Sequence, residues 1–498
     1  MRHLLRAVTV VALLLAAPAQ ARWLRADTPN FILYSEGSEA TLRDYATVVE
    51  DYDSLLRGLF KVERPPSPNR LTIYLVKNAD DLRRYTNLPT AAVGVYSATT
   101  GGISAFVVRG AATEGIDGRD VLLHEYAHHF MLQNFPANYP GWYIEGFAEY
   151  LMTAKFKPDT IEFGGFNLNR GQWLANGNWL PIGEILNGDP RSFKGERDAM
   201  FYAQSWLLVH YVYRDPVRNA AFEAYLKDVL KGTPPDTAFK AAFKVSYAHM
   251  ADDLHHYYER QMTYTRIKRK SQAAPVAITI TTLPPAADSL LLDQARLTLG
   301  VDTKFGPPLL AAVRRDAAKL PGDPFAARVA AQAEVEIGDR AAGQAMLDAL
   351  LAGDGKADAQ LLYLRGMSEM LAAEHDAAGM AQHRTQARRF FGRAHKLDPD
   401  QFQSLYRYAQ TFADGSKLTE NTANVMLLAH QLAPQVDAIT IDTAAMLAAR
   451  DRVAEARLLL EPVAHSPHGG SDAERAKAML DGLPAPAAAP TVAPTAAP

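Results

Sequence analysis

A pattern of the form H-E-x-x-H constrains this chain more than any other feature of its sequence. Its fixed positions are His124, Glu125 and His128. On a helix, residues i and i+4 lie one above the other on the same face, so both imidazoles can point at one metal ion. Glu125 falls beside them, positioned to hold a water molecule on the metal rather than the metal itself. The neighbouring residues are mostly apolar, which predicts a helix that is buried except for one face opening to a cleft.

A second acidic segment begins seventeen residues after His128. Glu145 and Glu149 are one turn apart on an expected helix that Pro140 and Gly141 introduce. Catalytic zinc takes three protein ligands and keeps a fourth position open, so one ligand has to come from outside H-E-x-x-H. Either glutamate could reach the metal, and the residues alone leave that choice open.

Taken together, the two patterns resemble those of the gluzincin class of metallopeptidases. The resemblance covers roughly residues 70–215 and implies an α+β zincin-like domain that hydrolyses peptide bonds with a zinc ion. It implies that Glu145 is the third zinc ligand and that Glu149 accepts the outer ring N–H of a ligand histidine. Glu125 would be the general base, taking a proton from the attacking water and passing it to the leaving amine.

The resemblance also implies a hydrogen-bond donor for the tetrahedral oxyanion on a later helix. The segment 198–211 offers Tyr202 and His210, of which Tyr202 is the preferred candidate. The alternative for Tyr202 is an aromatic core residue with a satisfied hydroxyl. His210 is expected to be structural, and so is His129, because it is rotated about 100° around the helix from His128.

Two segments before the H-E-x-x-H pattern predict strands. Residues 70–76 alternate polar and apolar side chains, and residues 94–108 predict a hairpin. The resemblance implies that an edge strand at residues 103–108 binds extended substrate by strand addition. No acidic residue occurs between Gly94 and Arg109 to receive a substrate α-amine, which favours an endopeptidase over an aminopeptidase.

Two other interpretations remain open. The H-E-x-x-H residues could form a charged helix face without a metal, or the chain could be an inactive zincin-fold scaffold that binds partners through its C-terminal half. His124, Glu125, His128, Glu145 and Glu149 are all present, which favours the enzyme.

The N-terminus predicts export. Residues 1–21 combine Arg2 and Arg6, an apolar run from Ala7 to Ala17, and an A-x-A cleavage site, as a secretory signal does. This run is too short for an ordinary transmembrane helix, and no later segment is long enough either. The absence of cysteine leaves no site for a lipid anchor or a disulfide. We therefore expect a periplasmic or secreted protein. Its net charge of −3 gives no indication of a nucleic-acid partner.

The remaining chain suggests a second, all-helical domain. We expect a peptidase domain over residues 22–270, a linker rich in Pro, Ala and Thr over 271–288, helical repeats over 289–483, and a disordered Ala/Pro tail over 484–498. The segment 394–399 recurs at 429–434 and, more weakly, at 464–467. A period near 34 residues resembles tetratricopeptide repeats, which implies stacked helix pairs that bind a protein or peptide segment. The alternative is an unrelated helical bundle.

Overall fold

The chain folds into a mixed α/β region followed by an all-helical region, as the sequence predicts. The computed structural model describes residues 22–86, 93–110, 117–260, 262–269, 276–353, 358–412, 419–466 and 469–484. The expected signal segment at 1–21 and nearly all of the expected tail at 484–498 lie outside these residues. Within the described chain, none of the helices is long and apolar enough to cross a membrane.

A six-stranded sheet forms the centre of the first region, with strand order β4-β5-β3-β2-β1-β9. Strands β2, β3 and β5 run parallel to one another, whereas β4, β1 and β9 pair antiparallel with their neighbours. The six strands are β1 (Leu24–Asp27), β2 (Phe31–Ser35), β3 (Leu71–Val76), β4 (Gly94–Thr99), β5 (Gly102–Val108) and β9 (Thr279–Thr282).

Among the described residues, ten α-helices, a short 3-10 helix at Pro190–Ser192 and a small second sheet complete the mixed region. Helix α3 packs against the sheet next to β4 and β5, and α4 lies between α3 and α7. The helices are α1 (Glu39–Phe60), α2 (Ala79–Thr86), α3 (Gly118–Asn134), α4 (Gly141–Leu151), α5 (Leu168–Asn176), α6 (Ile182–Asn187), α7 (Glu196–Tyr213), α8 (Pro216–Val229), α9 (Pro235–Phe243) and α10 (Tyr247–Tyr258). The second sheet consists of β6 (Lys155–Phe156), β7 (Thr160–Phe163) and β8 (Thr265–Lys268).

The expected strand at residues 70–76 and the expected hairpin at 94–108 are confirmed as β3 and β4–β5. The expectation that residues 103–108 form an edge strand is wrong. Strand β5 is paired on both sides, in parallel with β3 and antiparallel with β4. Among the described strands, β4 is therefore the outer strand next to α3. Strand order depends on pairing between distant segments, so the local pattern of the hairpin could not reveal which arm is the outer one.

The assignment of residues 276–288 to a linker also requires correction. These residues contain β9, which pairs with β1, and the beginning of α11. Ile278 and Ile280 pack against the central core, and β-branched residues occupy every position of β9, which favours a strand. Residues 271–275 lie outside the described part of the chain.

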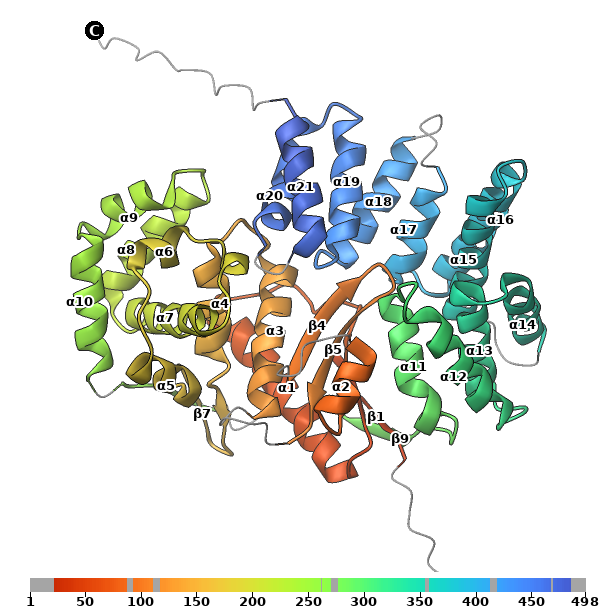
Figure 1. Ribbon diagram of the computed structural model, residues 1–498, viewed down its shortest axis with the longest axis horizontal. Helices are drawn as coiled ribbons and strands as arrows, with labels where there is room; N and C mark the ends of the chain where they lie inside the picture. The colour runs from red at the N-terminus through yellow and green to blue at the C-terminus, as the bar shows by residue number, and fades with distance from the viewer. Residues whose placement is uncertain are drawn as a thin grey trace, which may run out of the picture.

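The second region consists of helices that each pack against the next one in the chain. Alternate helices from α11 to α17 also contact one another, as in a stack of helical hairpins. The helices are α11 (Ala287–Leu299), α12 (Gly306–Ala318), α13 (Pro324–Ile337), α14 (Arg340–Ala352), α15 (Ala359–His375), α16 (Met380–Leu397), α17 (Phe402–Gln410), α18 (Glu420–Leu432), α19 (Asp437–Ala448), α20 (Val453–Ala464) and α21 (Gly470–Gly482). In Figure 1, α11–α16 lie on one side of the sheet and α17–α21 lie above α3 and β4.

The repeated segments occupy equivalent positions in this stack. Ala394, Ala429 and Ala464 each lie in the last turn of the second helix of a hairpin, in α16, α18 and α20. All three are buried. The repeat therefore reflects small side chains that let successive helices approach closely.

The two regions share one hydrophobic core. Phe402, Leu405, Met426 and Ile439 of the helical region belong to the same buried cluster as the helices and strands of the mixed region. The C-terminal helices are thus packed onto the mixed region rather than held only by a connecting segment.

Candidate metal centre

Helix α3 carries the H-E-x-x-H residues and is fixed at its start and in its middle. Asp117 caps its N-terminus by accepting a hydrogen bond from the backbone N–H of Arg119 at 2.9 Å. The buried Tyr126 hydroxyl donates to Asp53 of α1 at 2.7 Å. Because Tyr126 lies between the two histidines of the pattern, this bond fixes the rotation of α3.

Helix α4 packs against α3 and carries Glu145 and Glu149. Gly146, between them, packs directly against α7. A Cβ atom at this position would lie 2.4 Å from the backbone oxygen of Ser205, so only glycine permits this contact. Both glutamate side chains are at most 1% exposed.

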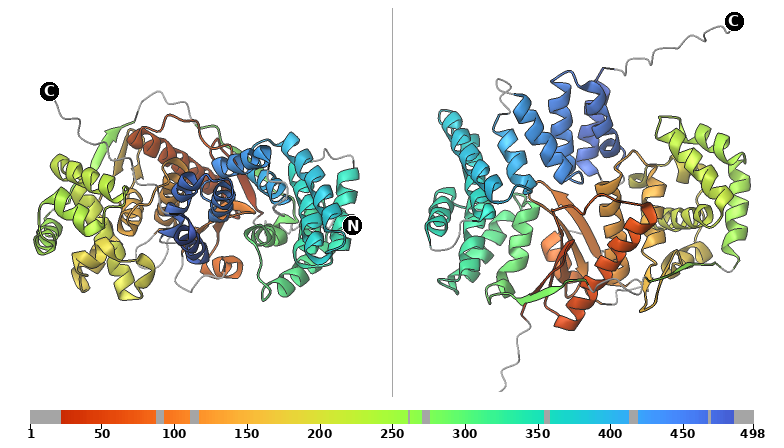
Figure 2. Two further views of the ribbon diagram at one scale, coloured as in Figure 1. Left: turned by 90° about the horizontal axis from the view of Figure 1, so that it is seen from above. Right: turned by 180° about the vertical axis from the view of Figure 1, so that it is seen from behind.

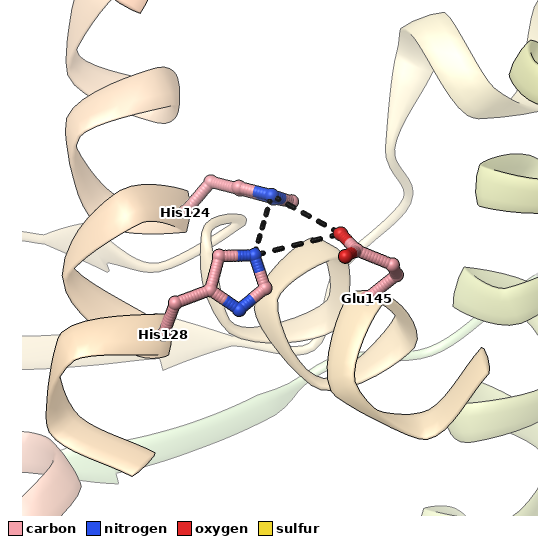
Figure 3. Close-up of side chains that lie close together, drawn as sticks. All are labelled: His124, His128 and Glu145. Atoms are coloured by element: carbon pink, nitrogen blue, oxygen red, sulfur yellow. Dashed lines mark hydrogen bonds and ion pairs between the residues drawn. The ribbon is translucent and has the colours of Figure 1, made fainter. Parts of the chain in front are cut away.

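The expected metal ligands converge. The Nε2 atoms of His124 and His128 lie 3.0 Å apart, and Glu145 Oε2 lies 3.6 Å from the first and 3.5 Å from the second. Figure 3 shows the three side chains pointing at one another from α3 and α4. One ligand atom from each lies within 4.8 Å of the others, so the three can hold a metal ion.

Glu149 has different surroundings. Its carboxylate accepts hydrogen bonds from Arg170 Nε at 2.9 Å, Arg170 Nη2 at 2.6 Å and Asn167 Nδ2 at 2.9 Å. Its Oε1 lies 3.3 Å from His124 Nδ1, the ring nitrogen that does not face Glu145. Burial opposes ionisation, but Arg170 and His124 lower the pKa of Glu149 to about 2. Glu149 is therefore a carboxylate in position to orient the His124 ring.

The centre strongly favours positive charge. Burial alone would lower the pKa of His124, but contacts with Glu145 and Glu149 raise it to about 10. A divalent cation would satisfy the same carboxylates, and two imidazoles with one carboxylate are a ligand set that zinc uses in catalytic sites. The residues therefore fit a metal ion.

Tyr202 of α7 lies beside this centre. Its ring centroid is 6.4 Å from that of His124, and the Arg170 guanidinium lies 5.0 Å from the Tyr202 centroid. The negative charge of Glu145 is the largest cause that raises the pKa of the Tyr202 hydroxyl, and burial raises it further. The hydroxyl therefore keeps its proton. No local sequence pattern points to Arg170 or Asn167, because only the fold brings α5 and its N-cap next to Glu149.

The other two histidines considered as candidates lie outside the triad. His210 is buried, with Nδ1 at 2.8 Å from the Tyr257 hydroxyl and Nε2 at 3.2 Å from the backbone oxygen of Thr263. His129 Nδ1 lies 3.1 Å from the Tyr96 hydroxyl, and burial lowers the pKa of this histidine to about 4. Both have the structural surroundings expected for them.

Glu125 is half-buried and faces a cleft next to His128. The cleft has a volume of about 590 Å³, within the roughly 300–1,000 Å³ common for ligand pockets. Strand β4 forms part of one wall, from Gly94 to Ala98. The cleft thus brings the outer strand, Glu125 and one expected metal ligand together.

No family model and no curated protein matches the chain. Among solved structures, the chain is similar to one described as YrrB, a TPR protein with an unusual peptide-binding site. That similarity covers 39% of this chain and 98% of the other, with 13% sequence identity and a TM-score of 0.26. The helix pairing described above rests on this chain's own packing.

Proposed function

We propose that this protein is an exported, zinc-dependent peptidase that cleaves within extended segments of its substrates. One observation carries the proposal: His124, His128 and Glu145 bring their ligand atoms within 4.8 Å of one another. Glu125 stands beside them in a cleft large enough for a peptide segment.

Zinc held by these three residues would supply a Lewis acid that polarises the scissile carbonyl and lets water lose a proton near pH 7. Glu125 would accept that proton and deliver it to the leaving amine. Glu149, held by Arg170, would keep the His124 ring oriented with Nε2 toward Glu145. Tyr202 would donate a hydrogen bond to the developing oxyanion.

The substrate would bind as an additional strand along β4. Strand addition uses the free backbone groups of an outer strand and suits an extended peptide. The proposal applies to β4 rather than to residues 103–108, because β4 is the arm of the hairpin that lines the cleft with Glu125. We propose cleavage within a chain because β4 itself contains no acidic residue to receive an α-amine; the carboxyl groups of the cleft lie on α3, α19 and α21.

Export is inferred from residues 1–21, whose basic start, apolar run and A-x-A site are those of a secretory signal. Turnover of an unfolded protein by the wild type and by Glu125→Gln tests the enzymatic part of the proposal. We expect hydrolysis only from the wild type. Equal turnover would reject Glu125 as the base, and no turnover by either would favour the scaffold alternative.

A further inference from the structure

The C-terminal helices form the second wall of the cleft that contains Glu125 and His128. Opposite β4 and α3, the lining comes from α18 to α21 and the turns between them. Figures 1 and 2 show these helices above the sheet in the front and back views. The lining residues from this wall include His430, Asp437, Thr440, Leu458, Leu459, Val463 and Asp472.

Helix α17, which packs against α18 at the start of this wall, is bonded to the mixed region. Gln403 Nε2 donates to the backbone oxygen of Gly101 at 3.1 Å, and Arg407 Nη2 donates to Thr100 Oγ1 at 3.1 Å. Both acceptors lie in the turn that joins β4 to β5. Together with the shared hydrophobic core, these bonds hold the wall in a defined position relative to the outer strand.

The cleft is acidic. Its described lining contains the carboxyl groups of Glu125, Asp437 and Asp472 and no lysine or arginine. Burial lowers the pKa of His430 to about 4, so this histidine adds no positive charge at neutral pH. The rest of the lining is mainly apolar, from β4, α3 and α20.

Asp437 lies at the start of α19 and faces the substrate strand. It lines the same cleft as Tyr96 of β4 and Glu125 of α3, and α19 contacts β4 directly. Within the described chain, its side chain makes no hydrogen bond and no ion pair. Burial, and then Asp472, raise the pKa of Asp437 to about 7, so this group is partly protonated at neutral pH, and a cationic substrate group beside it would stabilise its charged form.

We propose that α18–α21 are the specificity wall of this cleft and that Asp437 selects extended peptides carrying a lysine or arginine side chain near the scissile bond. This inference rests on the proposed peptidase function. It assigns the helical region a direct part in substrate selection, since the wall and the outer strand would contact the same bound peptide from opposite sides.

Matched peptides that differ only by Lys or Gln at each position near the cleavage site test the charge preference in the full chain. We expect kcat/KM to be at least about fivefold higher for the lysine peptide at one position, as hydrogen bonds to charged groups allow. Asp437→Asn should reduce that ratio to about two or less, mainly through KM. Asp481→Asn is the control, because Asp481 is exposed on α21 and does not line the cleft.

A preference for neutral or acidic peptides, or an unchanged ratio in Asp437→Asn, would overturn the inference. Binding separates this outcome from a failure of the peptidase proposal. The Glu125→Gln chain should bind a fluorescent lysine peptide at least about fivefold tighter than its glutamine counterpart. If that preference is present but no form of the protein hydrolyses peptides, the wall assignment holds and the enzymatic proposal fails. Equal binding of the two peptides overturns the wall assignment.

The wall itself can be tested without reference to charge, because the chain contains no cysteine. Leu458 lines the cleft and is 68% exposed, so Leu458→Cys can be modified with a bulky maleimide. Modification should lower turnover of a neutral peptide at least about fivefold relative to the unmodified variant. Leu397→Cys, at an exposed position of α16 outside the cleft, should show no effect of modification. Equal turnover before and after modification of Leu458→Cys would remove α20 from the substrate wall.

Discussion

Glu149 Oε1 lies 3.3 Å from Nδ1 of His124, while the other nitrogen of the same ring faces Glu145 at 3.6 Å. One imidazole is thus held between two glutamates that are one turn apart on α4. Glu149 also accepts hydrogen bonds from Asn167 and Arg170. We therefore propose that Glu145 binds the metal and that Glu149 supports His124.

The first prediction concerns metal content. The purified chain should bind about one zinc ion, and Glu145→Ala should abolish binding because a ligand is lost. Glu149→Ala should retain zinc with an affinity about 10–100-fold lower, the usual cost of losing a residue that orients a ligand. Zinc titration with a competing chelator measures both. The reverse ranking of the two variants would mean that the glutamates exchange roles.

A second prediction concerns Arg170, which forms a buried pair with Glu149. Arg170→Gln removes the guanidinium that binds the buried Glu149 carboxylate and should lower the free energy of unfolding by roughly 3–5 kcal/mol. The exposed pair of Arg191 with Asp189 provides the control, and Arg191→Gln should cost less than about 1 kcal/mol. Urea denaturation of both variants in the presence of chelator gives the comparison. Similar losses in the two would show that the Glu149 pair contributes no more than a surface contact.

Much of this site follows from local sequence. The spacing of His124 and His128 fixes their common helix face, and the glutamate spacing fixes the corresponding face of α4. Arg170, β9 and the wall formed by α18–α21 could not be predicted, because each depends on contacts between segments far apart in the chain. The outer strand was assigned to the wrong arm of the hairpin for the same reason.

Tyr202 gives a third prediction. If its hydroxyl stabilises the oxyanion, Tyr202→Phe should keep zinc and stability but lose about 10²–10³-fold in kcat. The hydroxyl is the only group removed, so the ring contacts with His124 and Arg170 are preserved. Steady-state kinetics with a peptide substrate measure kcat for the variant and the wild type. An unchanged kcat would make Tyr202 an aromatic packing residue of α7.

The shared core gives a fourth prediction. A fragment of residues 22–270 lacks β9 and the helices that cover the cleft, so it should have a lower melting temperature and weaker zinc binding than the full chain. A fragment of residues 22–484 should match the full chain in both. Thermal unfolding and zinc titration compare the three proteins. Full stability and zinc affinity in the shorter fragment would show that the two regions are independent domains.

The most direct test of the central claim compares the wild type with Glu125→Gln, measuring zinc content and hydrolysis of an unfolded protein in the same samples. Glu125 is half-buried in the cleft and is not among the three ligands, so the variant should retain about one zinc per chain. Its hydrolysis should fall at least about 10²-fold, because the proton acceptor is lost. Wild-type turnover in a zinc-loaded Glu125→Gln chain, or no turnover in a zinc-loaded wild type, would contradict the proposal that this centre is a peptidase active site.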